Sequence, residues 1–213
     1  MGLTINENLT WKSHLNKIAN KTSKYNGIIN KLKRFLPQHI LQTLYYSLIQ
    51  SQLNYCILVW GFESGRVEKI QKKSVRIITC SQYNAHTEPL FKKQKLLKVN
   101  DLFKLNALKF FYKLKNNKLP SYFTSINVHS HSVSHDYNTR SNRFIRDNHT
   151  RTQFAQNCIR NRLPSIVNNT DNLIISKVDT HSYKGFSNYI KQHMIKQYSA
   201  ECFLLNCYIC NRN

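Results

Sequence analysis

The sequence predicts a mainly α fold, with a helical bundle, a long polar connection and a small helical C-terminal segment. Apolar residues return every third or fourth position through most of the chain, which is the period of a helix with one buried face. The 213 residues include only 5 glycines and 4 prolines, too few for the turns of an all-β protein. The prolines fall between the apolar-periodic blocks. A chain of this length suits one domain or two small ones.

The first predicted helix lies in "LTWKSHLNKIANKTSKYNGIINKLKRFLP", residues 9–37. Thr10 stands where an N-cap hydroxyl could accept a hydrogen bond from the first turn, and Pro37 marks the expected end. Apolar spacings of four and three alternate, which places these residues on one stripe that only Thr22 weakens. The stripe consists of Trp11, Leu15, Ile18, Thr22, Tyr25, Ile29, Leu32 and Leu36.

Lysines form a column on the opposite face of this helix. Lys17, Lys24 and Lys31 recur every seven residues, and Lys21 and Arg34 flank them. The helix contains no acidic residue that could pair with them, so we expect the column to face outward. Its members lie about 10 Å apart at about 1.5 Å rise per residue, a spacing that could follow phosphates along a groove without reading bases.

A second helix is predicted from Pro37 to about Trp60, where Gly61 would end it. Its apolar stripe is too wide for a surface helix, so we expect it at the centre of the core. The stripe consists of Leu41, Leu44, Tyr45, Leu48, Ile49, Leu53, Cys56 and Val59.

The third helix, "RVEKIQKKSVRII" at residues 66–78, repeats the plan of the first. Its predicted buried face consists of Val67, Ile70, Ser74, Ile77 and Ile78. Its far face carries four cations: Arg66, Lys69, Lys73 and Arg76. A fourth helix is predicted over residues 101–117, with Leu102, Leu105, Leu108, Phe111, Tyr112 and Leu114 as its apolar set.

The periodicity fails after this bundle, which divides the chain into four parts. Residues 1–127 are the bundle, and residues 128–150, rich in Ser, His, Asn and Arg, are a polar linker. Residues 151–198 form a small helical segment, with helices expected at 151–164 and 180–199. Residues 199–213 are a cysteine-containing tail.

The charge of the chain indicates a polyanionic partner. Lys and Arg number 32 against 10 Asp and Glu, giving a formal net charge of +22, and self-repulsion on that scale favours nucleic acid as the partner. A membrane is not expected, because no stretch has the roughly 18 near-continuous apolar residues of a spanning helix. No apolar signal-peptide core follows the first residues, so we expect an intracellular protein, nuclear or cytoplasmic.

The sequence offers little for catalysis or cofactors. Nucleotidyl transfer with two Mg²⁺ ions needs converging carboxylates, and the ten acidic residues are scattered. The five glycines lack the offsets of a phosphate-binding loop. Cys202, Cys207 and Cys210 are a weak zinc candidate, since only Cys207 and Cys210 have the spacing with which one turn presents two thiolates. We therefore expect no bound cofactor or metal.

Several blocks of sequence, in order, carry a resemblance to one family. They are residues 1–37, "LYYSLIQSQLNYCILVWG", "IQKKSVRIIT", "HTEPLFKKQKLLKVNDL", "FFYKLKNNKLP", "HDYNTR", "NRLPSI" and "FSNYIKQHMIKQYS". Together they resemble the region that follows the polymerase palm in non-LTR, LINE-type (jockey-like) retrotransposon reverse transcriptases. The resemblance covers nearly the whole chain up to about Ser199. The family often has Trp-Asn-x-Leu-Pro where this chain has Arg160, Asn161, Arg162, Leu163 and Pro164.

The resemblance implies a thumb-like bundle over residues 9 to about 80 that closes over a primer–template duplex. In the family the catalytic aspartates and the Mg²⁺ they bind belong to the palm, upstream of the matched region. No catalytic residue is therefore carried over, and we expect no polymerase activity from this chain alone. The missing palm and fingers are expected partners.

Three interpretations remain open on the sequence. The chain is a nucleic-acid-binding fragment of a retrotransposon RNA-directed DNA polymerase, an independent basic RNA- or DNA-binding helical protein, or a decayed transposon remnant without activity. The expected nucleic-acid-binding residues are the same in the first two: Lys17, Lys21, Lys24, Lys31, Arg34, Arg66, Lys69, Lys73 and Arg76.

Overall fold

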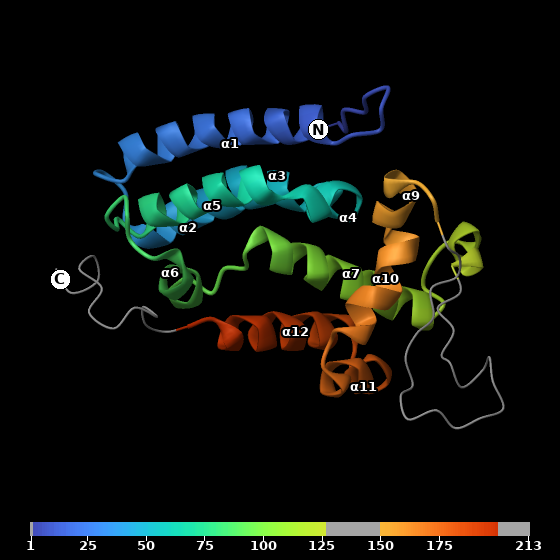
Figure 1. Ribbon diagram of the computed structural model, residues 1–213. Helices are drawn as coiled ribbons and strands as arrows, with labels where there is room; N and C mark the ends of the chain where they lie inside the picture. Colours follow the sequence, from blue (N-terminus) through green and yellow to red (C-terminus); the bar gives the residue numbers. More distant parts are fainter. Residues whose placement is uncertain (1, 127–149, 200–213) are drawn as a thin grey trace. The chain divides into compact units, whose positions relative to one another are not determined.

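The computed structural model describes residues 2–126 and 150–199, and all their regular elements are helical (Figure 1). The predicted mainly α fold is thus confirmed. Two compact units are present: unit 1 comprises the described residues 2–102 and 191–199, and unit 2 comprises 103–126 and 150–190. The predicted linker falls almost entirely outside the described residues, so the predicted domain boundaries stay a prediction.

Helix α1 spans Lys12–Leu32, shorter at both ends than predicted. Thr10 is not its N-cap, because the Thr10 hydroxyl accepts a hydrogen bond from the Asn6 amide at 3.2 Å while Trp11 occupies the cap position. The helix ends five residues before Pro37, since Phe35 is 81% exposed and leaves the last predicted turn without packing. Leu36 instead closes a turn through its N–H to the Leu32 carbonyl at 3.0 Å.

The predicted second helix is interrupted. Helix α2 (Gln38–Leu44) continues through a π-helical turn, η1 (Tyr45–Gln50), into α3 (Ser51–Asn54). The chain then breaks at Cys56, which adopts a left-handed φ of 49°, before the separate helix α4 (Ile57–Trp60).

This break changes which side chains are buried. Val59, predicted to be buried, is 38% exposed, whereas Trp60 is completely buried. The Trp60 indole N–H donates to the Tyr55 carbonyl at 2.9 Å, so the break supplies the acceptor that a buried tryptophan requires.

The rest of unit 1 follows from α5. A 3₁₀ turn, η2 (Gly61–Glu63), leads into α5 (Gly65–Ile78), which coincides closely with the predicted third helix. The prediction missed the short helix α6 (Thr87–Lys93). Helix α5 packs along α1, and its buried residues include Gln71 and Val75 as well as most of the predicted stripe (Figure 1).

Helix α7 (Val99–Lys115) confirms the predicted fourth helix and is followed by the 3₁₀ turn η3 (Ser121–Ser125). The predicted helix over 151–164 is two helices, α9 (Gln153–Asn157) and α10 (Ile159–Asn168), because Cys158 adopts an extended ψ of 142°. The helix α11 (Asn172–Thr180) was not predicted, and α12 (Tyr183–Gln197) coincides with the last predicted helix.

Aromatic packing holds unit 2 together. The rings of Tyr112 on α7 and Phe186 on α12 lie 5.2 Å apart, and the Tyr112 hydroxyl donates to the His181 carbonyl at 2.8 Å. Leu163 and Val167 of α10 are also completely buried. Lys115 pairs with Asp179 of α11 at 2.8 Å.

Candidate nucleic-acid interface

The predicted lysine column is a charged surface of α1. Lys17, Lys21, Lys24 and Lys31 are all exposed, as is Arg34 just beyond the helix. None of them pairs with a carboxylate among the described residues. The Lys17 ammonium donates to the Thr4 hydroxyl at 3.0 Å, and the others extend into solvent on the face opposite buried Leu15 and Ile18.

The predicted cations of α5 differ in their surroundings. Arg66, Lys69 and Lys73 are exposed, and Arg66 donates to the Asn16 side chain of α1. Arg76 is half-buried, and its Nε donates to the Ala85 carbonyl at 2.8 Å. Burial lowers the pKa of Arg76, and nearby Tyr83 opposes this effect.

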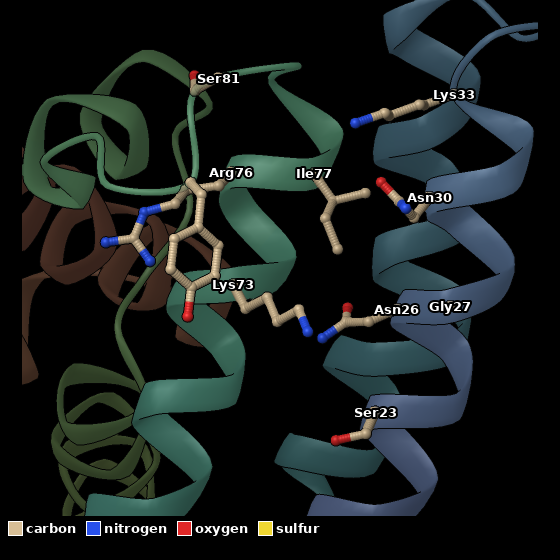
Figure 2. Close-up of a pocket in the computed structure, with 10 residues that line it drawn as sticks. Ser23, Asn26, Gly27, Asn30, Lys33, Lys73, Arg76, Ile77 and Ser81 are labelled. Carbon is tan, nitrogen blue, oxygen red and sulfur yellow. The ribbon is translucent and has the colours of Figure 1, made fainter.

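A cleft of about 350 Å³ lies between α1 and α5, and we call it the α1–α5 cleft. Three cations line it, Lys33, Lys73 and Arg76, and no carboxylate is among the described residues that do so. Figure 2 shows Lys33 reaching in from the end of α1 and Lys73 from α5, while Arg76 points away from α1. Two cations from different helices therefore face one space.

The wall of the cleft formed by α1 consists of small polar residues. Asn16, Asn20, Ser23, Gly27 and Asn30 alternate at spacings of four and three, so they share one face of the helix. The last three line the cleft. Their short side chains leave room beside the longer cations of α5 and offer hydrogen-bonding groups to a polar ligand.

Asn26 presents an unsatisfied acceptor in the cleft. Its side chain is 2% exposed and points from α1 toward α5 (Figure 2). The Nδ2 atom donates to the Ile70 carbonyl at 3.4 Å, and only an N–H can donate there, which fixes the orientation of the amide. Its Oδ1 atom has no hydrogen-bond partner among the residues that the structure describes.

The fold itself does not require Gly27. A Cβ atom at this position would meet no atom within 4 Å, and the residue has an ordinary helical φ. Glycine in a helix interior costs about 1 kcal/mol relative to alanine. Its presence in the middle of α1 therefore keeps space in the cleft at some cost in stability.

The structure thus brings together part of the predicted site. Lys73 and Arg76 join the cleft, whereas the α1 column lies on a different face of that helix. Sequence reasoning missed Lys33, Asn26 and Tyr83. Lys33 follows Asn26 by seven residues, two turns along the same face, and this spacing could have indicated it.

No group of three potential metal ligands occurs in the part of the chain that the structure describes. The zinc candidate Cys202, Cys207 and Cys210 lies outside it, so its lack of zinc stays a prediction. No helix within 2–126 or 150–199 is long and apolar enough to cross a membrane.

No protein-family model, curated protein or solved structure matches the chain.

Proposed function

We propose that this chain binds nucleic acid through its phosphate backbone, with the α1–α5 cleft and the surrounding cations as the interface. The observation that carries the proposal is a cleft flanked by Lys33 and Lys73 from two helices, with no carboxylate among its described lining residues. Cations placed in this way neutralise phosphates. The counterions that had been condensed on the nucleic acid are then released, and this release supplies much of the binding affinity.

The surroundings of the cleft support a backbone contact more than base reading. Lys69 and Lys73 of α5 are exposed and pair with no carboxylate in the described part of the chain, whereas Lys72 on the same helix pairs with Glu68 at 2.8 Å. Asparagine and serine, the residue types on this face of α1, commonly form hydrogen bonds to phosphate and sugar oxygens in nucleic-acid complexes. The net charge of +22 agrees with a polyanionic ligand.

The resemblance to non-LTR reverse transcriptases makes the proposal more specific. We propose that the chain corresponds to the thumb and post-thumb region of such a polymerase, with a primer–template duplex or RNA as its ligand. The palm and fingers would then be partners that supply the aspartates and Mg²⁺. No described residue cluster here could hold that metal, so we assign no catalytic step to this chain.

A charge-matched comparison tests the proposal. The double variant Lys33→Gln, Lys73→Gln removes two cations from the cleft, and Lys93→Gln, Lys95→Gln removes two exposed cations elsewhere in unit 1. We expect the cleft variant to bind labelled oligonucleotides more weakly and to flatten the slope of log K against log[salt] by about 0.9 per lost contact for a duplex. Equal effects of the two variants would contradict the proposed interface.

Polymerase activity is a separate test. The purified chain with a primed template, nucleotides and Mg²⁺ or Mn²⁺ should give no extension, because two-metal catalysis requires converging carboxylates and no group of three potential metal ligands occurs among the described residues. Extension that survives repurification would contradict assignment of the chain to the region outside the palm.

A further inference from the structure

We propose that the α1–α5 cleft holds one unpaired nucleotide of a single strand, with the ring of Tyr83 as its stacking surface. This inference rests on the proposed nucleic-acid binding and specifies its ligand. It predicts that single strands use the Tyr83 ring and the Asn26 acceptor, which an intact duplex cannot reach, whereas Lys33 and Lys73 are available to the phosphates of either ligand.

Tyr83 lines the same cleft as the cations Lys33 and Lys73. The tyrosine lies in the connection after α5 and is 83% exposed. An exposed aromatic ring beside phosphate-binding cations is the arrangement with which proteins hold unpaired bases, since every base has a face that can stack. In a duplex the bases already stack on their neighbours, so none is free for this ring.

The buried acceptor of Asn26 favours a ligand that can donate a hydrogen bond. A phosphate at neutral pH offers oxygens that accept hydrogen bonds, so it leaves the Asn26 Oδ1 unsatisfied. A sugar hydroxyl or an exocyclic base amine donates a proton and satisfies it. The floor of the cleft therefore matches a nucleoside, whereas Lys33 and Lys73 match the phosphate attached to it.

The size of the cleft and the residues of its walls also fit a single nucleotide. Its volume of about 350 Å³ lies at the lower end of small-molecule sites, which suits one nucleotide but not a helical duplex. Ile77 contributes an apolar wall from α5, and Figure 2 shows it directed toward α1. Gly27 keeps the facing wall free of a side chain.

The test compares a labelled single-stranded oligonucleotide with the duplex of the same sequence, by fluorescence anisotropy with the full chain. We expect Tyr83→Ala to weaken single-strand binding about 5- to 150-fold, the range of one lost base stack, and to change duplex binding by less than about twofold. Tyr83→Phe should retain single-strand binding, because it keeps the ring. Tyr122→Ala, which removes a ring that is 84% exposed in unit 2, should leave both affinities unchanged.

A second variant tests the cleft without removing a contact. Gly27→Leu places its Cβ where no atom of the described residues lies within 4 Å, so we expect the fold to tolerate the leucine while its longer side chain fills the cleft. We expect loss of single-strand binding with the helical circular dichroism of the wild type. Unchanged single-strand binding in either Gly27→Leu or Tyr83→Ala would overturn the nucleotide site.

A titration with AMP separates a free nucleotide from a strand. We expect the strand to bind at least about tenfold more tightly, because the neighbouring cations of α5 contact its further phosphates. AMP that binds as tightly as the strand would overturn the single strand as the ligand. If neither the single strand nor the duplex bound, the proposed function itself would be wrong. If both bound and Tyr83→Ala weakened both equally, only the nucleotide site would be refuted.

Discussion

The side-chain amide of Gln71 donates a hydrogen bond to the hydroxyl of Tyr45 across 2.9 Å, and both side chains are completely buried. The same amide donates to the Leu97 carbonyl at 2.9 Å and accepts from the Val99 N–H at 3.0 Å. Burial raises the pKa of Tyr45, an effect that the Gln71 hydrogen bond opposes. This glutamine links α5 to η1, to Leu97 and to the first residue of α7, and so stabilises the wall of the α1–α5 cleft formed by α5.

Replacing Gln71 with leucine should lower the free energy of unfolding by about 2–5 kcal/mol. Leucine is apolar and of roughly similar size, but it leaves the Leu97 carbonyl and the Val99 N–H unsatisfied, each at a cost of about 1–3 kcal/mol, and removes the hydrogen bond to the Tyr45 hydroxyl. Urea unfolding followed by circular dichroism measures the change. Gln82→Leu, at an exposed position, is the control. A Gln71→Leu protein within about 0.5 kcal/mol of the wild type would contradict this role.

The fold was predictable where apolar periodicity was strong. Helices α1, α5 and α7 were found because long regular stripes place many buried side chains on one face. The break at Cys56 was not predictable, because a left-handed φ at a non-glycine residue depends on tertiary contacts such as the burial of Trp60. Helix α6 was missed because seven residues are too few to establish a period.

The candidate site was predictable only in its charges. The spacing placed Lys73 on an exposed face of α5, whereas Arg76, predicted on the same face, is half-buried. Tyr83 could not be placed, because a loop residue has no period that fixes its direction. Asn26 lies among apolar residues on the buried face of α1. That its Oδ1 atom lacks a hydrogen-bond partner depends on how α5 packs against α1, which the sequence does not specify.

Stability should fall in mild acid because of His14. This side chain is 4% exposed, its Nδ1 accepts from the Thr4 N–H at 3.3 Å, and Trp11 and Trp60 lie against its ring. Burial, and secondarily the charge of Lys17, lowers the pKa of His14. The unfolded chain therefore takes up the proton first, so the stability contributed by neutral His14 is complete above its ordinary pKa of 6.5 and decreases as the pH falls below it.

The His14 effect can be isolated by comparison with a variant. Urea unfolding at pH 7.5 and 5.5 should show a larger loss of stability for the wild type than for His14→Phe, which cannot take up a proton. His39→Gln, at an exposed position, should keep the wild-type pH dependence. Equal pH dependence of the wild type and His14→Phe would show that His14 is not responsible.

The lysine column of α1 should contact duplex phosphates outside the cleft. Replacing Lys17, Lys24 and Lys31 with glutamine should weaken duplex binding about equally for unrelated sequences and reduce the salt slope by up to about 0.9 per lost contact. Anisotropy titrations over a range of salt concentrations measure both. The fold should be preserved, because all three side chains are exposed. Unaltered affinity and slope would make the column an ordinary solvated surface.

The opposite face of α1 provides the complementary control. Leu15 and Ile18 are each 6% exposed, so Leu15→Ala or Ile18→Ala should lower the free energy of unfolding by about 2–5 kcal/mol without changing the charge. At temperatures where these variants remain folded, their salt slope should equal that of the wild type. The two sets of variants therefore separate packing from phosphate contact on one helix.

Gly27→Ala should raise the free energy of unfolding by about 0.5–1 kcal/mol. The added methyl group meets no atom within 4 Å, and alanine restricts the unfolded chain more than glycine does. Gly185→Ala is the matched comparison, because a Cβ there would lie 3.3 Å from the Ser182 hydroxyl, and its gain should be smaller. Thermal unfolding measures both changes. A methyl group fills little of the cleft, so the Gly27→Ala protein should still bind single strands, in contrast to Gly27→Leu. A loss of stability in Gly27→Ala would mean that other atoms of the protein occupy this space. The cleft would then not be open to a ligand.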